Sequence, residues 1–366
     1  KPSVSKDKVL VRVKNCGICG SDIPRIYRDG AHKMPLITGH EFSGEVIGVG
    51  SPKLGAWEGK RVGIFPLIPC KKCGPCLLGH YEMCRNYSYL GSRTDGGFAE
   101  YVSVPAWNLI ELPENVTFEQ AAMLEPMSVA AHAIRRMGLT EKSSNQADRK
   151  TPETEGKTNK IAVYGQGTIG LMLLMLLLAE GYEEIYVFGN HDLQKEKACE
   201  LGLPAESFCD IRKEDTRAWA KAHFGDGADI SFEAVGNEKT YEQADELAAP
   251  GCKVCIVGNP YTDMDLKREI YWKILRNQLT LYGTWNSSFG TADISDASAA
   301  STVVSTRCNE ADTEDDWHYI LRLLSERKIS PEKLISHRYP IDALEEGFLL
   351  MRDKKEDYIK VMMESN

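Results

Sequence analysis

The stretch KIAVYGQGTIGLMLLMLLLAEGYEEIYVFGN, residues 160–190, has the order strand, tight turn, helix, strand. Its first β-rich run covers 160–164, and its second strand is expected over 184–188. The glycines of GQGTIG allow a tight turn and a close backbone approach to a pyrophosphate, whose charge is stabilised at the helix N-terminus. The pattern therefore predicts a dinucleotide-binding βαβ unit. The candidate cofactor-binding residues in the turn are Gly165, Gly167, Thr168, Ile169 and Gly170.

The helix and the end of the second strand refine this prediction. We interpret the Leu and Met side chains of the helix as core that packs on the sheet. An NAD site usually has Asp or Glu about twenty residues after the glycine turn, where it binds the ribose 2′-OH. This chain has Gly189, Asn190 and His191 there. Because no carboxylate repels a 2′-phosphate, and Asn190 and His191 offer hydrogen bonds, the sequence favours NADP(H) over NAD(H), although no Arg occupies those positions.

Length and charge limit the class of protein. With 366 residues the chain is longer than a single core usually grows, so two domains are expected. A net charge of -9 and a pI near 5.5 argue against nucleic acid or an acidic membrane surface as a partner. The longest apolar run, at 171–179, is too short to span a bilayer, and we see no secretory signal. We therefore expect a cytoplasmic protein.

Four of the eleven cysteines lie in the stretch CKKCGPCLLGHYEMC, residues 70–84. The spacing C-x2-C-x2-C-x7-C lets a short loop hold one tetrahedral Zn²⁺ with Zn–S distances of about 2.3 Å. Two disulfides or an iron–sulfur cluster are the alternatives, but a reducing cytosol disfavours disulfides and the ferredoxin spacings differ. Because sulfur fills all four positions, we expect a structural zinc that takes no part in chemistry. The ligands are Cys70, Cys73, Cys76 and Cys84.

A second group of metal ligands is spread along the chain. Cys19 in NCGICGSD, His40 in TGHEFSG and Glu125 in LEPMSV offer one sulfur, one nitrogen and one oxygen, a mixed set that leaves a fourth zinc position open. Glu41, next to His40, is an alternate ligand or a supporting carboxylate. Taken singly, each residue is explained as well by packing, a satisfied polar group or a loop charge. Together they predict a catalytic zinc site.

In this order, the motifs resemble the zinc-dependent medium-chain dehydrogenases. The matching stretches are GICGSD, GHEFSG, the four-cysteine lobe, DGGFAEY and GQGTIG, so the resemblance covers nearly the whole chain. A Glu at the EP position, where alcohol dehydrogenases place a cysteine, is similar to the polyol dehydrogenase branch. Four further stretches resemble members of that branch that act on a phosphorylated polyol: GSDIPRIYRDGAH, PLIPC, GSRTDGGFAEY and GTWNSSF.

The resemblance implies an α/β fold with two domains. A GroES-like, partly open β-barrel catalytic domain would comprise 1–132 and 286–366 and hold both metals, and a Rossmann-type doubly wound parallel sheet would comprise 133–285. The β-rich runs VLVRVK, GEVIGVG and RVGIF before the zinc lobe agree with this order, as do the alternating strands and helices after residue 160. The resemblance also implies a homodimer or homotetramer.

Two polar stretches fit this scheme less well. Residues 140–160 and 290–316 are poor in bulky apolar side chains, unlike the segments around them. A functional lid and a tolerated surface insertion are both consistent with such a composition, and loop statistics favour the insertion.

The mechanism follows from the open metal site. Zinc held by Cys19, His40 and Glu125 would bind the substrate hydroxyl and lower its pKa, so that an alkoxide forms near neutral pH and hydride leaves for the nicotinamide ring. The resemblance assigns Ser21 to a hydroxyl relay that passes the proton to water, and Asp22 to the carboxylate that orients His40. The alternative is that GSD is only a turn.

Recognition of a phosphorylated polyol requires cations in this acidic chain, because the substrate carries about two negative charges. Arg93 is the first candidate, followed by Lys33 and His32, and Trp285 and Asn286 are candidates for closing the polyol pocket. Each is also explained as a solvated surface group. Sorbitol, idonate and threonine dehydrogenases would keep the metal and nucleotide residues and differ in the pocket. A non-catalytic NAD(P)-binding scaffold is the alternative from another class.

Overall fold

The computed structural model describes residues 1–140, 159–290 and 314–365. The two polar stretches, 140–160 and 290–316, therefore lie almost entirely outside the described residues, and the prediction of surface insertions stays a prediction. Among the described helices, none combines the length and the apolar character that a membrane span requires.

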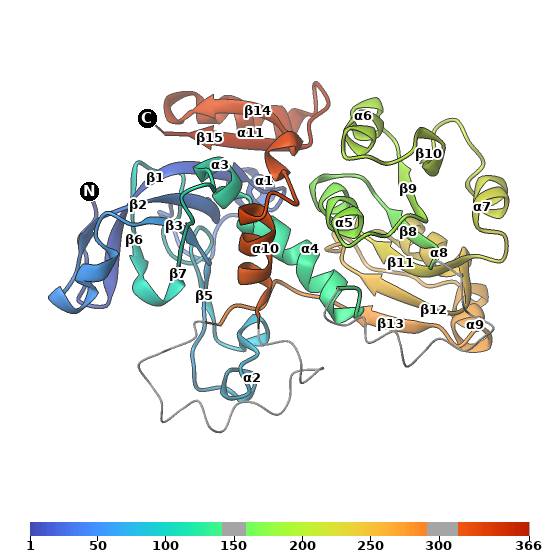
Figure 1. Ribbon diagram of the computed structural model, residues 1–366, viewed down its shortest axis with the longest axis horizontal. Coiled ribbons are helices and arrows are strands. Elements are labelled where there is room, and N and C mark those ends of the chain that lie inside the picture. Colours follow the sequence, from blue (N-terminus) through green and yellow to red (C-terminus); the bar gives the residue numbers. More distant parts are fainter. Residues whose placement is uncertain (141–158, 291–313, 366) are drawn as a thin grey trace. The chain divides into compact units, whose positions relative to one another are not determined.

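The chain divides into two compact units. The first combines the two ends of the chain, Lys1–Ser128 and Ser287–Asn366, and the second is Val129–Asn286. Figure 1 shows the first unit as a twisted, mostly antiparallel sheet with short helices, and the second as a sheet flanked by helices. We describe each unit by itself.

The first unit is built on a seven-stranded sheet in which β1 is central. The hydrogen-bonded order is β14-β15-β1-β2-β3-β7, and β6 also pairs with β1. Val9, Val11 and Val13 of β1 are fully buried and alternate with more exposed residues, the period-two pattern of a strand with one face in the core. The strands are β1 (Lys8–Ile18), β2 (Glu41–Val49), β3 (Arg61–Ile64), β6 (Tyr101–Pro105), β7 (Leu109–Glu111), β14 (Ile335–Pro340) and β15 (Lys360–Glu364).

An aromatic cluster ties the returning C-terminal segment to the N-terminal part of the first unit. The rings of Phe65 and Phe289 stack with centroids 4.5 Å apart, and Trp317 meets Phe65 edge-on at 5.4 Å. Trp317 is fully buried, and its indole N–H donates to the Ser287 hydroxyl at 3.0 Å. Buried aromatic pairs of this kind are worth about 1 kcal/mol each beyond their buried area, so the two segments form one core.

Short elements complete the first unit. The strands β4 (Leu67–Ile68) and β5 (Ser88–Tyr89) form an antiparallel ribbon at the base of the cysteine-rich loop. The helices are α1 (Asp22–Tyr27), α2 (Gly74–Leu77), α3 (Phe118–Ala122), α10 (Asp316–Ser325) and α11 (Leu344–Asp353). The 3₁₀ helices are η1 (Pro52–Trp57), η2 (Tyr81–Met83), η3 (Ala106–Asn108), η7 (Pro331–Leu334) and η8 (Ile341–Ala343). Helix α4 (Leu124–Arg136) begins in this unit and ends in the second.

The second unit is a six-stranded sheet in the order β10-β9-β8-β11-β12-β13, with parallel pairing throughout. Renumbered along the chain from β8, this is the order 3-2-1-4-5-6 of a doubly wound nucleotide-binding sheet, which confirms the predicted fold class. The strand order reverses between β8 and β11. The strands are β8 (Ile161–Tyr164), β9 (Ile185–Gly189), β10 (Phe208–Asp210), β11 (Ala228–Glu233), β12 (Ala248–Ile256) and β13 (Thr280–Gly283).

Helix α5 (Thr168–Ala179) follows the glycine turn as predicted. Every residue from Gly170 to Leu177 is buried, so the Leu and Met side chains are core on all sides of the helix. The other helical elements of the unit are α6 (Asp192–Glu200), α7 (Thr216–Phe224), α8 (Glu238–Glu246), α9 (Arg268–Arg276) and the 3₁₀ helix η6 (Ala205–Ser207).

Candidate active site

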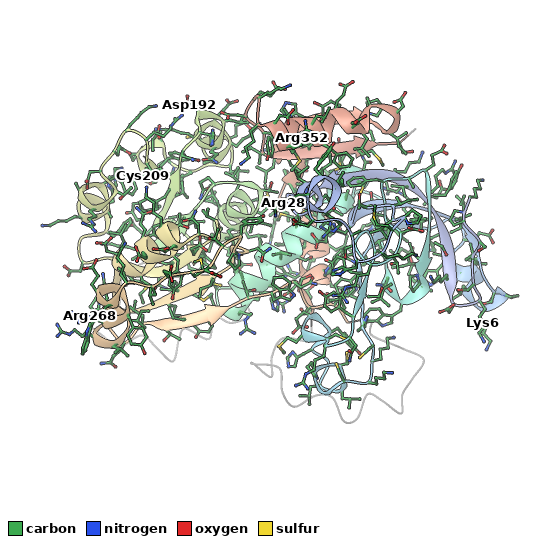
Figure 2. The ribbon with its side chains drawn as sticks, turned by 180° about the vertical axis from the view of Figure 1, so that it is seen from behind. Lys6, Arg28, Asp192, Cys209, Arg268 and Arg352 are labelled. Atoms are coloured by element: carbon green, nitrogen blue, oxygen red, sulfur yellow. The ribbon has the colours of Figure 1, made fainter. Side chains whose placement is uncertain are left out.

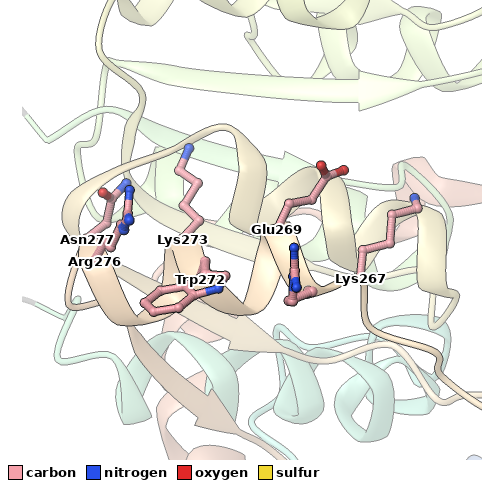
Figure 3. Close-up of a pocket in the computed structure, with 7 residues that line it drawn as sticks. Lys267, Glu269, Trp272, Lys273, Arg276 and Asn277 are labelled. Atoms are coloured by element: carbon pink, nitrogen blue, oxygen red, sulfur yellow. The ribbon is translucent and has the colours of Figure 1, made fainter.

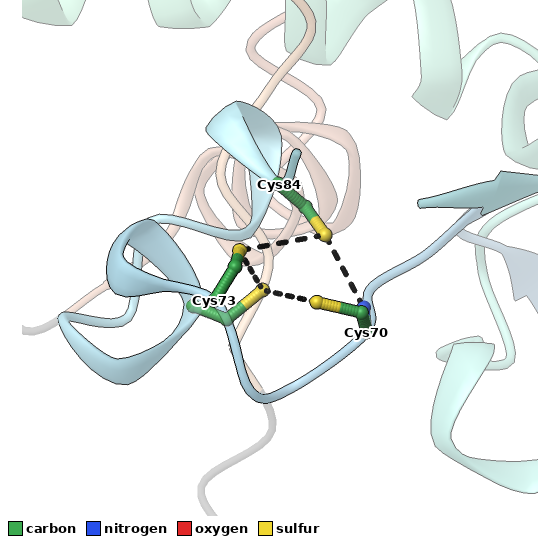
Figure 4. A group of neighbouring side chains, drawn as sticks. Cys70, Cys73 and Cys84 are labelled. Carbon is green, nitrogen blue, oxygen red and sulfur yellow. Dashed lines mark hydrogen bonds between the residues drawn. The ribbon is translucent and has the colours of Figure 1, made fainter. Parts of the chain in front are cut away.

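The four cysteines of the 70–84 loop converge on one point, as Figure 4 shows for Cys70, Cys73 and Cys84. Their Sγ atoms are 3.5 Å apart for Cys73 and Cys76, 3.9 Å for Cys73 and Cys84, and 4.0 Å for Cys70 and Cys76. A tetrahedron with Zn–S bonds of about 2.3 Å has S···S edges of about 3.8 Å, whereas a disulfide is about 2.05 Å long. The geometry fits a closed zinc site and excludes disulfides among these four residues.

Backbone groups support thiolates in this loop. N–H groups of Arg85 and Cys76 lower the pKa of Cys73 to about 6, and the N–H of Cys70 donates to the Cys84 Sγ at 3.2 Å. Burial, in contrast, raises the pKa of Cys76 to about 12. Zinc binds the deprotonated form of each thiol. The backbone hydrogen bonds therefore favour the thiolate at Cys73, whereas burial disfavours it at Cys76.

The mixed ligand group is assembled by the pairing of β1 with β2. Gly17 of β1 lies opposite Glu41 of β2, so Cys19, just after β1, meets His40, just before β2. The ligand atoms of Cys19, His40 and Glu41 all lie within 4.8 Å of one another, and His40 and Glu41 are buried. One sulfur, one nitrogen and one oxygen are the donor set of an open zinc site.

Asp22 lies behind this group and is completely buried. Its Oδ2 accepts from the N–H of Cys19 at 3.1 Å, and its Oδ1 accepts from Arg25 Nη1 at 2.8 Å and lies 3.5 Å from His40 Nδ1. Burial lowers the pKa of His40, but Asp22 and Cys19 together raise it by more, so the pKa lies well above its usual range. His40 Nδ1 has no hydrogen-bond partner among the described residues, which leaves Asp22 Oδ1 as the nearby acceptor. Arg25 was not predicted from the sequence.

Glu125, in the first turn of α4, is buried near the group but bonded elsewhere. Its Oε1 accepts from the Tyr89 hydroxyl at 2.9 Å, and the Tyr89 ring meets the His40 ring edge-on at 5.9 Å. Burial raises the pKa of Glu125 to about 7, and the Glu41 carboxylate adds to this while His40 opposes it. Of the two glutamates predicted as ligands, Glu41 therefore lies in the group with Cys19 and His40, and Glu125 is held by Tyr89.

Glu41 itself is paired with Lys360, the first residue of β15. Both side chains are 2% exposed, and the Lys360 ammonium also donates to the Ile18 carbonyl at 3.1 Å. Burial lowers the pKa of Lys360, but Glu41, together with Cys19 and Glu125, raises it by more, which favours the ammonium form beside the Glu41 carboxylate. The predicted relay residue Ser21 donates its hydroxyl to Cys19 Sγ at 3.4 Å. Sequence reasoning missed Lys360, whose only signal is a lysine opening an apolar run.

The glycine turn of the second unit fits a pyrophosphate. Gly165 has φ +90°, and a Cβ there would collide with Val235. A Cβ on Gly170 would collide with the Gly165 carbonyl, so these two glycines permit the tight turn and the close packing of the helix start. A Cβ on Gly167 meets no described atom within 4 Å, so there is open space at Gly167, which directly precedes α5. Among the described residues, the first turn of α5 contains no acidic side chain.

A cavity of about 310 Å³ lies in the same unit at the carboxyl ends of β11 and β12. Glu233 lines it and accepts at 2.9 Å from the N–H groups of both Val235 and Gly236, which fixes the loop after β11. Ligands of doubly wound sheets bind outside the carboxyl ends of the strands. The cavity is therefore part of the candidate cofactor site.

The predicted substrate residues have different surroundings. Arg93 is half-buried, donates to the Tyr87 carbonyl at 3.0 Å and stacks on the Tyr87 ring, whereas His32 and Lys33 are exposed. Trp285 and Asn286 belong to the second unit, Trp285 being 58% exposed and Asn286 having φ +57°. The substrate role of these five residues stays a prediction.

Comparison with known proteins identifies matches across both units. Residues 5–114 match the alcohol dehydrogenase GroES-like domain, and residues 168–302 match the zinc-binding dehydrogenase domain. Galactitol 1-phosphate 5-dehydrogenase from Escherichia coli strain K12 is 32% identical over 340 residues, which cover 91% of this chain and 86% of that protein. L-threonine 3-dehydrogenase from Bacillus licheniformis is 31% identical over 360 residues, 96% of this chain and 90% of that protein.

A solved structure agrees with these matches. The crystal structure of galactitol-1-phosphate dehydrogenase from Escherichia coli aligns with a TM-score of 0.78 and 30% identity, covering 99% of this chain and 94% of that one. The similarity therefore extends to the arrangement of the elements and is not confined to the motifs.

Proposed function

Because this chain belongs to the zinc-dependent medium-chain dehydrogenase family, we propose that it oxidises a secondary alcohol of galactitol 1-phosphate to give tagatose 6-phosphate. The family establishes the chemistry, a zinc- and NAD(P)-dependent alcohol or polyol dehydrogenase. The assignment of a phosphorylated polyol as the substrate is more specific than the family. It rests on similarity to galactitol 1-phosphate 5-dehydrogenase over nearly the full length, in both sequence and structure.

We assign the catalytic zinc to Cys19 and His40, with Glu125 as third ligand and Glu41 as the alternate ligand. When bound, zinc acts as a Lewis acid on the substrate hydroxyl, and NAD(P) accepts the hydride. Cys19 Sγ and a ring nitrogen of His40 lie within 4.8 Å of each other and of a Glu41 carboxylate oxygen, which supports a metal site here. Glu125 is buried beside this group and is bonded to Tyr89. Asp22, which accepts from the Cys19 N–H, would restrain the Cys19 loop and orient the His40 ring through Nδ1.

The proton released from the substrate hydroxyl needs a path to water. Ser21 Oγ lies 3.4 Å from Cys19 Sγ, so its hydroxyl borders the proposed metal ligand and supports the relay role. Arg93, with Lys33 and His32, remains our candidate for the substrate phosphate, because a guanidinium binds a phosphate through two parallel N–H···O bonds.

We further propose NADP(H) as the preferred cofactor. The end of β9 has Gly189, Asn190 and His191, and none of them presents a carboxylate to a 2′-phosphate. The backbone N–H groups of Asn190 and His191 donate to the Gln194 side-chain carbonyl, at 2.9 and 3.2 Å, and both residues are exposed.

The test is a substrate comparison with purified enzyme. Oxidation of galactitol 1-phosphate, sorbitol, idonate and L-threonine is followed by NAD(P)H absorbance at matched concentrations. The proposal predicts the highest kcat/KM for the phosphorylated polyol, and a loss of that preference in Arg93→Ala. A preference for L-threonine would instead support the second candidate, which the match to L-threonine 3-dehydrogenase favours. No turnover of any alcohol would support a non-catalytic scaffold.

We also propose that the protein assembles as a homodimer or homotetramer. The edge strand β13 is mostly exposed, and α9 presents Trp272 and Leu275, 50% and 52% exposed, beside an open pocket lined by Lys273 and Arg276. Figure 3 shows Trp272, Lys273 and Arg276 on this helix. An exposed edge strand with apolar neighbours is a surface that a second copy can pair with. Light scattering of Leu281→Lys against the parent protein tests this, with a smaller particle expected.

A further inference from the structure

The strand order brings a distant segment to the end of β9. Strand β10 pairs in parallel with β9, with Asp210 opposite Gly189, and the N–H of Ile211 donates to the Gly189 carbonyl at 3.0 Å. The residues that follow β10 therefore emerge beside Asn190 and His191. At this edge of a doubly wound sheet the adenosine ribose of a dinucleotide is bound through its 2′ position.

Two cations in that segment reach the start of α6. The Arg212 guanidinium lies 2.5 Å from Asp192 Oδ1, and the Lys213 ammonium lies 3.7 Å from the same oxygen. Asp192 directly follows His191 and is the first residue of α6. Figure 2 labels Asp192 at the surface of the second unit. The positive charge that the sequence around Asn190 lacks is thus supplied from the next strand.

The two carboxylates around Arg212 differ in their surroundings. The carboxylate of Asp210 is buried and accepts from Arg212 Nε at 2.8 Å and from Arg212 Nη2 at 2.7 Å. These bonds hold the pKa of Asp210 far below its usual range. The Asp192 side chain is 81% exposed. Asp210 therefore positions Arg212, whereas Asp192 occupies the outer side of the guanidinium, where water and an anionic ligand compete for it.

We propose that Arg212, supported by Lys213, binds the 2′-phosphate of NADP(H), which replaces Asp192 on the outer face of the guanidinium. This rests on the proposed cofactor preference and names the residues that produce it. A phosphate dianion offers a guanidinium and an ammonium more charge than one exposed carboxylate, and it binds Arg through two parallel N–H···O bonds. Asp192 then competes with the 2′-phosphate for Arg212. The preference for NADP(H) therefore depends on how much more tightly Arg212 binds the phosphate than it binds the Asp192 carboxylate.

The experiment measures binding and needs no turnover. Calorimetry compares adenosine 2′,5′-bisphosphate with 5′-AMP, which differ only in the 2′-phosphate. The parent protein is expected to bind the bisphosphate at least about tenfold more tightly, because hydrogen bonds between charged groups are stronger than those between neutral groups. Arg212→Ala is expected to remove most of this ratio and to leave the 5′-AMP affinity within about twofold. Asp192→Asn is expected to raise the ratio.

Matched variants make the outcome decisive. Arg217→Ala removes another exposed arginine of the second unit, one paired with Glu246, and should leave the ratio unchanged. If Arg212→Ala is poorly folded by circular dichroism, Lys213→Ala gives the same test with a smaller expected loss. Equal affinity of the parent for the two ligands, or an equal loss of both in Arg212→Ala, overturns the inference. A selective bisphosphate site in a protein that fails to oxidise polyol phosphates would leave the inference standing and refute the substrate proposal.

Discussion

The two candidate metal centres of the first unit are built in opposite ways. The cysteine lobe takes four identical ligands from one loop, Cys70 to Cys84, and three pairs of their sulfur atoms lie 3.5–4.0 Å apart. The other centre takes different ligands from separate segments and surrounds them with buried charges, Asp22 and Lys360 among them. The first arrangement closes a metal off and holds a loop together. The second leaves a coordination position for chemistry, and its geometry depends on the sheet.

The largest expected effect is the loss of activity at the mixed centre. Cys19→Ser should lower kcat/KM by more than about a thousandfold, because several kcal/mol of transition-state stabilisation come from the metal. Zinc analysis should show one ion lost per chain and the lobe zinc retained. Cys199→Ser, at an exposed thiol, is the control and should match the parent. Full activity in Cys19→Ser would remove the distinction between the centres.

Loss of a cysteine ligand in the lobe should lower the stability of the protein and should not act on the reaction directly. Cys73→Ser is expected to lower the free energy of unfolding by more than about 3 kcal/mol, because a structural zinc contributes its binding energy to folding. Urea denaturation monitored by circular dichroism, with and without a chelator, measures this loss of unfolding free energy. A Cys73→Ser protein that is inactive yet as stable as the parent would show that the lobe takes part in the reaction.

The mixed centre contains an ion pair, Glu41 with Lys360, in which both side chains are buried. Lys360→Met leaves the Glu41 carboxylate buried without its partner, and the expected loss of unfolding free energy is about 3 kcal/mol. The double variant Lys360→Met with Glu41→Gln should recover much of this loss, since no charge is then left alone. Urea denaturation of both variants measures the difference. Equal stability of the single variant and the parent would contradict an ionic pair.

The smallest expected effect is a change in zinc affinity that decides whether Glu125 or Glu41 is the third ligand. Tyr89→Phe removes the hydroxyl that bonds Glu125 Oε1, so a ligating Glu125 should bind zinc up to about tenfold more tightly. Zinc affinity at the mixed centre is measured by competition with a chromophoric chelator. Tyr186→Phe removes a comparable Tyr–Glu bond, to Glu184 in the second unit, and serves as the control. An unchanged affinity in Tyr89→Phe would favour Glu41.

Sequence reasoning succeeded where the determinants are local. The cysteine spacing predicts a lobe whose sulfurs do converge, and the glycine turn predicts β8, α5 and β9, because neighbouring residues and a backbone conformation decide both. It failed where the determinants are topological. Lys360 meets Glu41 only because β15 pairs with β1, and Arg212 reaches Asp192 only because β10 pairs with β9.

A sequence motif also cannot predict which of two glutamates binds the metal. Glu125 and Glu41 are both carboxylates near His40, and the sequence could not show that Tyr89 holds one of them and Lys360 the other. Such partners depend on which buried groups the fold leaves within hydrogen-bond distance.

Anomalous diffraction at the zinc absorption edge, on crystals of the freshly purified protein, tests the contrast between the two centres most directly. We predict two peaks per chain, one among the sulfurs of Cys70, Cys73, Cys76 and Cys84, and one within bonding distance of Cys19 Sγ and the His40 ring. A peak in the cysteine lobe alone would contradict the account.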